Sequence, residues 1–174
     1  HNRGAALPKK LVNLLKSPPG YWDLPELPEI GSPLSESGLI KKSQREFSEK
    51  FSAKGCFFGV NGASGLIQSA IIALANPGEF ILMPRNVHIS VIKTCAMQNI
   101  LPIFFDLEFS SETGHYKPIT KIWLENVFKK INFNEKKIVG VILVSPSYHG
   151  YAGDLEPLIE LCHQKNLPVL VDEA

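Results

Sequence analysis

The pattern of apolar positions becomes regular from Gly55 onward, where short apolar runs alternate with longer segments of helical periodicity. Apolar runs predict strands at 56–60, 79–83, 101–106, 137–145 and 167–174, while periodic segments predict helices at 64–75, 87–98, 119–131 and 155–165. Residues 108–118 are expected to form a polar loop. Strands that are apolar throughout and separated by helices are typical of a parallel sheet covered on both faces. We therefore predict an α/β fold, a doubly wound, mostly parallel sheet with helices on both faces.

The first 54 residues have a different pattern. The stretch "SPPGYWDLPELPEIGSPLSESG" is rich in proline, glycine and serine and shows little periodicity, and a helix is expected after it at residues 39–51. We therefore assign residues 1–54 to an N-terminal arm with a lead-in helix, and residues 55–174 to the α/β domain.

Composition excludes several classes of function. A chain of 174 residues with 44% hydrophobic content can bury one sizeable core, and a net charge of +1 gives no electrostatic basis for binding nucleic acid or an anionic membrane. The longest apolar runs are too short to span a bilayer, and no signal peptide is visible. Three cysteines without zinc-ligand spacing indicate free thiols, no metal site and a cytoplasmic location. The missing initiator methionine and the abrupt end lead us to expect a fragment.

Candidate chemistry lies directly after the predicted strands. Ligands of open parallel sheets bind beyond the carboxyl ends of the strands, so the residues at those ends should converge. They are Asn61–Gly65 after the first strand, Pro84–His88 after the second, Ser145–Gly150 after the fourth and Asp172 after the last.

Each of these motifs has a plain structural reading by itself. The "NGASG" turn favours a phosphate at a helix start, but an N-capping Ser64 would look the same. There is neither a dinucleotide-binding fingerprint nor a P-loop, which also argues against a helicase-like reading of the "DEA" ending. A lone His88 is more often a surface or capping residue, and a lone Asp172 could be a cap or a magnesium ligand.

In combination the motifs are more specific. The segments "HNRG", "WDLPELPEIGSPLSESGLIKKSQREF", "VNGASG", "PRNVHISV", "SPSYHGYAGDL" and "VLVDEA" occur in the order found in the Orn/Lys/Arg decarboxylase family, and the chain resembles the N-terminal part of its major domain. The resemblance implies a truncated fold-type I large domain that binds pyridoxal 5'-phosphate. It implies decarboxylation of lysine, ornithine or arginine to a diamine or agmatine, a step of polyamine biosynthesis.

The resemblance also implies a role for individual residues. Asp172 pairs with the protonated pyridine nitrogen of the cofactor, and Ala174 packs on one face of the ring. His88 stacks on the opposite face, near the substrate carboxylate, and assists protonation. Ser64 and the backbone amides of Ala63 and Gly65 hold the phosphate, although the family often has threonine at the position of Ala63.

One residue of the family pattern is absent. The Schiff-base lysine stands in a Ser-x-His-Lys motif downstream of the aspartate, and no lysine here has that context. We therefore expect the chain to be inactive alone. The resemblance further implies a basic amino-acid substrate and a homodimer or higher homo-oligomer, but it leaves open which basic amino acid is used. Alternatives are another fold-type I activity, such as an aminotransferase or aldolase, and a non-catalytic α/β module derived from such an enzyme.

Overall fold

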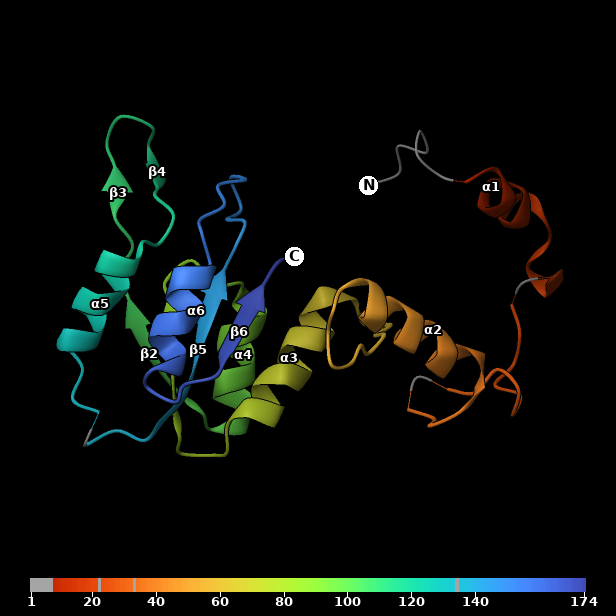
Figure 1. Cartoon of the computed structure of the whole chain (residues 1–174), viewed down its shortest axis with the longest axis horizontal. Helices are drawn as coiled ribbons and strands as arrows, with labels where there is room; N and C mark the ends of the chain where they lie inside the picture. Colours follow the sequence, from red (N-terminus) through yellow and green to blue (C-terminus); the bar gives the residue numbers. More distant parts are fainter. Residues whose placement is uncertain (1–7, 22, 33, 134) are drawn as a thin grey trace. The chain divides into compact units, whose positions relative to one another are not determined.

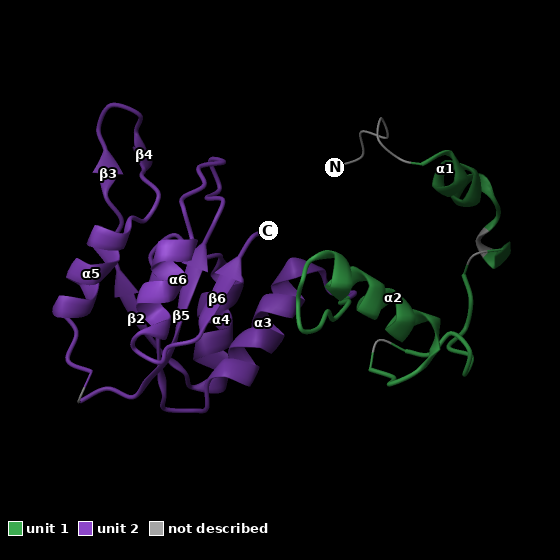
Figure 2. Cartoon of the chain, in the orientation of Figure 1, with its two compact units in different colours: residues 1–59 green, residues 60–174 purple. Residues whose placement is uncertain are grey.

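The computed structural model describes residues 8–21, 23–32, 34–133 and 135–174. It divides into two compact units, residues 1–59 and residues 60–174 (Figure 2). The two units are described separately below. None of the helices in the described part of the chain has the length and apolar character needed to cross a membrane.

Unit 1 is made of short helices and turns. Its helices are α1 (Lys9–Lys16), a 3-10 turn (Pro19–Tyr21) and α2 (Gly38–Lys50). The start of α2 is tied to the preceding turn because Leu39 N donates to Glu29 O (3.0 Å) and Ile40 N donates to Ile30 O (3.1 Å). The predicted helix at 39–51 is therefore confirmed. Helix α1 was not predicted, although its apolar residues have helical spacing.

Unit 2 is built around a four-stranded parallel sheet. Its strand order is β2-β1-β5-β6, and every neighbouring pair runs parallel. The sequence order of the strands differs from their order in the sheet, as expected for crossovers through helices. The strands are β1 (Phe80–Pro84), β2 (Leu101–Phe105), β5 (Ile138–Val144) and β6 (Val169–Asp172).

Helices cover both faces of this sheet (Figure 1). Alternate strand residues enter two separate cores: Ile81 and Met83 pack on the α3/α4 side, while Leu82 packs on the α5/α6 side. The doubly wound α/β fold predicted from the sequence is thus confirmed. The helices are α3 (Gly62–Leu74), α4 (Ile89–Gln98), α5 (Lys121–Lys129) and α6 (Glu156–His163).

The predicted strand at 56–60 is wrong, because these residues form no strand. Phe57 and Val60 are 72% and 88% exposed, and no described strand pairs with this run. An apolar run forms a strand only where a neighbouring strand supplies backbone hydrogen-bond partners. The β-propensity of residues 56–60 was therefore not sufficient to make them a strand.

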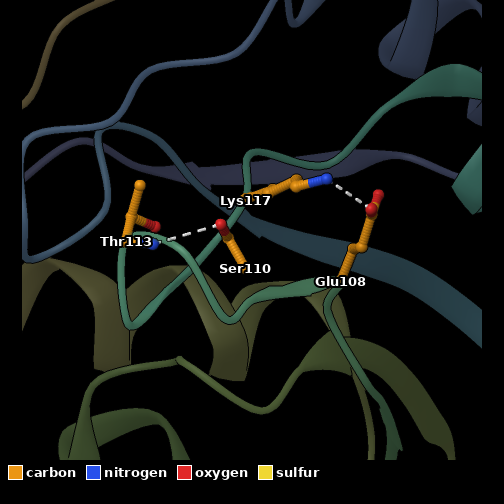
Figure 3. A network of polar contacts seen from close by, with 4 residues as sticks. All are labelled: Glu108, Ser110, Thr113 and Lys117. Atoms are coloured by element: carbon orange, nitrogen blue, oxygen red, sulfur yellow. Dashed lines mark hydrogen bonds and ion pairs between the residues drawn. The ribbon is translucent and has the colours of Figure 1, made fainter.

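The predicted polar loop at 108–118 contains a small hairpin. Strands β3 (Phe109–Ser110) and β4 (His115–Tyr116) pair antiparallel, with Phe109 opposite Tyr116. Figure 3 shows how the hairpin is closed: Lys117 Nζ is 2.5 Å from Glu108 Oε1, and Thr113 N donates to Ser110 Oγ at 3.4 Å. Gly114 supplies the positive φ of the turn (72°).

Candidate active site

The first turn of α3 is open toward solvent at its backbone N–H groups. The N-cap residue Asn61 makes no side-chain capping hydrogen bond, and Gly62 enters the helix with a φ of 67°. Ala63, Ser64 and Gly65 follow inside the helix, so Ser64 lies in the first turn and is not the N-cap. Small side chains here leave the amides accessible to a ligand, and the helix dipole favours an anionic one.

His88 is the N-cap of α4. Ser90 N donates to His88 Nδ1 at 3.2 Å, and Ser90 Oγ lies 2.7 Å from the same nitrogen. A ring nitrogen can accept a hydrogen bond only when it carries no proton. Because Nδ1 accepts from a backbone N–H, the neutral ring carries its proton on Nε2. The capping contact thus holds the ring at Nδ1, and His88 is an exposed residue.

Asp172 is a buried carboxylate at the last position of β6. Its residue is only 6% exposed, and its main chain is held in register because Ser145 N donates to Asp172 O at 3.0 Å. Ala174 N donates to Asp172 Oδ1 at 3.2 Å, which leaves Oδ2 without a recorded partner among the described residues. Glu173 and Ala174 are exposed. Asp172 is thus largely buried as a residue, and its Oδ2 oxygen is available to a further partner.

The predicted site residues share one edge of unit 2. In a parallel α/β unit the helices run antiparallel to the strands. Each helix therefore begins at the edge where the strands have their carboxyl ends. Figure 1 shows the arrowheads of β5 and β6, the C-terminus and the start of α3 (yellow) at this edge, and α3 packs against β6. Residues 63–65 come from α3, His88 precedes α4, Asp172 ends β6, and Ala174 lies two residues beyond it.

Other residues at this edge brace the loops. Arg85 Nε forms an ion pair with Asp106 Oδ1 at 2.7 Å, which joins the carboxyl ends of β1 and β2. Ser147 closes the loop after β5, since its N–H donates to Tyr151 O (2.8 Å) and its Oγ accepts from Tyr151 N (3.2 Å). Ser147 therefore braces this loop.

Two features of this edge were not expected from the sequence. The His149 ring stacks on His115 of the hairpin, with ring centroids 4.0 Å apart. Asn86 Oδ1 is buried and has no hydrogen-bond partner within the described residues, and Asn86 lines a small cavity together with Ser145 and Ser147. Both features join residues distant in sequence, so periodicity gave no signal for them.

The described residues fit a cofactor that carries both a phosphate and a protonated ring nitrogen. The open first turn of α3 offers N–H donors to the phosphate. The buried Asp172 offers a negative charge that is partnered, among the described residues, by one N–H. Its Oδ2 oxygen is available to accept a charge-assisted hydrogen bond, which a protonated pyridine nitrogen would donate.

Comparison with curated proteins gives a consistent set of relatives. The chain is 33% identical to arginine decarboxylase of Bacillus subtilis (strain 168) over 174 residues, which covers 100% of the chain and 35% of the relative. It is 36% identical to arginine decarboxylase of Bacillus cereus over 137 residues, 79% of the chain and 29% of the relative. It is also 25% identical to lysine decarboxylase LdcA of Pseudomonas aeruginosa over 78% of the chain and 16% of the relative. The chain therefore spans about a third of the length of its first curated relatives.

Solved structures share the fold at low identity. The SepCysS–SepCysE N-terminal domain complex matches 97% of the chain and 42% of the solved chain, with a TM-score of 0.70 and 18% identity. Serine palmitoyltransferase of Sphingomonas wittichii matches 77% of the chain and 30% of the solved chain, with a TM-score of 0.56 and 16% identity. The family profile described as "Orn/Lys/Arg decarboxylase, major domain" matches residues 21–174. The chain belongs to the Orn/Lys/Arg decarboxylase family and carries part of its major domain.

Proposed function

We propose that this chain forms part of a pyridoxal 5'-phosphate-dependent decarboxylase that removes the α-carboxylate of a basic amino acid as carbon dioxide. The observation that carries the proposal is the buried Asp172 at the carboxyl edge of the sheet, where the uncapped first turn of α3 also begins. Family membership supports the same reaction.

In this proposal the cofactor phosphate sits at the first turn of α3. The N–H group of Ala63 and the hydroxyl of Ser64 donate to it, and the helix dipole adds to the attraction. Gly65 was also assigned to the phosphate from the sequence, but it is the fourth residue of α3, so its N–H donates within the helix. Ala63 offers no hydroxyl, so Ser64 is the hydroxyl donor of this turn. Because Asn61 makes no side-chain cap, the N–H groups of Ala63 and Ser64 stay available to the ligand.

Asp172 holds the proton on the pyridine nitrogen. Bound pyridoxal phosphate supplies an electron sink for the electron pair that carbon dioxide leaves behind, and the sink is strongest when its ring is cationic. Burial places Asp172 in a low dielectric, where its charge interacts more strongly with the ring than it would in water. The bond from Ala174 N keeps the carboxylate in one orientation.

His88 and Ala174 flank the ring in this arrangement. The Ser90 contact orients the imidazole so that its Nε2–H is free to meet the substrate carboxylate and to move a proton. The small side chain of Ala174 leaves space for the ring on the other side.

Arginine is the substrate that we propose to test first, because the first four curated relatives carry the name arginine decarboxylase. We further propose that the protein works in the cytoplasm as a homodimer or higher homo-oligomer, that its reaction belongs to polyamine biosynthesis, and that the lysine which binds the cofactor covalently lies outside these residues. These points rest on the family alone.

The test is an assay of the full-length protein loaded with pyridoxal phosphate. L-arginine, L-lysine and L-ornithine are supplied separately, carbon dioxide release is measured, and the amine product is identified by mass spectrometry. We expect stoichiometric carbon dioxide and one amine, with arginine giving agmatine. Transfer of the amino group to a keto acid without carbon dioxide would contradict the proposal and would favour an aminotransferase.

A further inference from the structure

We propose that a groove between the edge strand β2 and helix α5 binds a small amphipathic carboxylate with a flat or branched apolar body. The groove has a volume of about 870 Å³, within the range of small-molecule pockets. It lies on the α5 side of the sheet, and none of the predicted cofactor residues lines it. The inference is independent of the proposed decarboxylase function.

The groove has an apolar floor and one helical wall. Leu82 and Phe105 form part of the floor and are almost completely buried, so their positions are fixed by the core beneath. The wall is one face of α5, since Trp123, Val127 and Lys130 recur at helical spacing. A rigid floor and a regular wall give a surface on which a flat apolar body can pack.

The loop after α5, which contributes Ile131 and Lys136 to the groove, is anchored. The loop after α5 packs Phe133 against Phe128 of the helix, with ring centroids 5.7 Å apart. Lys165 of the neighbouring segment lies over the same Phe133 ring at 5.0 Å. Near the start of α5, Trp123 Nε1 donates to Asp106 O at 2.7 Å, which ties this helix to the end of β2. Helix α5 and the loop after it are therefore both held in place by side-chain contacts.

The charge around the groove is positive. Lys129, Lys130 and Lys136 line it, and none of them has an ion pair recorded among the described residues. Of the two acidic residues that line it, Asp106 is neutralised by Arg85 at 2.7 Å, which leaves Glu135 as a single opposing charge. An anionic head group on the ligand complements this excess of ammonium groups.

An extended peptide is a poor occupant because the free edge of β2 is blunted. Leu101 N donates to Glu79 O (2.9 Å) and Phe105 O accepts from Arg85 N (3.1 Å), so the odd-numbered residues of β2 bond toward β1. Pro102 and Phe104 consequently face the open edge, and Pro102 has no N–H to donate. A strand that offers one outward N–H supports strand addition weakly. A small molecule fits the groove better than a peptide.

Isothermal titration of the full-length protein with 2-naphthoate tests the proposal, with 2-naphthamide as the uncharged counterpart. Saturating pyridoxal phosphate is present so that the predicted active site is filled. We expect saturable binding of the acid and at least tenfold weaker binding of the amide, about the loss that follows removal of one charge-assisted hydrogen bond. The paired substitution Lys130→Gln and Lys136→Gln is expected to weaken binding of the acid by a similar factor.

Two further variants locate the binding. Lys93→Gln removes an exposed charge from α4 on the other side of the sheet and should leave affinity unchanged. Val127→Trp fills the groove and should abolish binding while the melting temperature shows that the protein is folded. Three results would each overturn the proposal: no saturable binding of the acid, equal binding of acid and amide, or the same loss in Lys93→Gln as in the Lys130/Lys136 pair.

Discussion

Gly65→Ala tests whether the first turn of α3 has room for a side chain. A Cβ atom at residue 65 would lie 2.7 Å from the Cβ of Asn61, closer than two carbon atoms approach without displacement. Asn61 is the N-cap, so relief of this clash moves the start of the helix. The same movement shifts the amides that we propose to hold the phosphate.

Two opposing effects decide the size of the change. Alanine is favoured over glycine inside a helix by about 1 kcal/mol. Overpacking of a fixed position costs about 1–3 kcal/mol. We therefore expect Gly65→Ala to lower the free energy of unfolding by up to about 2 kcal/mol. Cofactor affinity should fall as well, because a displaced hydrogen bond to a charged phosphate is worth about 1.5–3 kcal/mol.

A double-mutant cycle identifies the cause. Asn61→Gly removes the Cβ that causes the clash and costs little at an N-cap. In the Asn61→Gly background, Gly65→Ala should no longer lower the free energy of unfolding measured in urea or the affinity measured in a pyridoxal phosphate titration. Only the gain in helix propensity should remain. Equal effects of Gly65→Ala with and without Asn61→Gly would refute the reasoning, since the two sites would then be independent.

Three other changes test separate features. His88→Asn keeps an N-cap side chain but removes the imidazole, so turnover should fall about a hundredfold with an unchanged melting temperature; normal turnover would show that His88 is only a cap. The N–H of Asn76, followed by the Lys137 ammonium, lowers the pKa of Glu79. The stability advantage over Glu79→Gln should therefore be full above about pH 5 and should be lost as the pH falls through the lowered pKa; an advantage that does not change with pH would contradict this cause. Burial raises the pKa of the Cys162 thiol to about 11, so peptide mapping should find it unmodified by iodoacetamide at pH 8 until urea unfolds the chain, and rapid modification of the folded protein would contradict its burial.

Much of the fold follows from local patterns. The runs that became β1, β5 and β6 are apolar on both faces, and such runs are stable only in a sheet that is covered on both sides. Ile81 and Leu82 are neighbours in β1 and are buried in opposite cores, which explains why this strand is apolar at every position. The run at 56–60 has similar composition but no strand beside it, and no property of the run itself indicates that difference.

The candidate site was predictable as a set of strand ends but not as contacts. The carboxyl-edge rule placed Asp172 and residues 63–65 on one side of the sheet, because parallel topology fixes that edge. The capping role of His88 depends on the rotamer that brings its ring to Ser90, and the stack of His115 on His149 depends on a hairpin absent from the periodicity. Contacts of this kind are set by tertiary packing, which a single sequence does not display.

Turnover of Asp172→Asn in the full-length protein tests the central claim most directly. Asparagine keeps an oxygen that can accept from Ala174 N, so the fold at the end of β6 is preserved while the negative charge is lost. We expect pyridoxal phosphate to remain bound and decarboxylation to fall by about a hundredfold or more, since the ring nitrogen is no longer held protonated. Glu173→Gln, which removes the exposed carboxylate next to it, should have wild-type turnover. Wild-type turnover in Asp172→Asn would contradict the account.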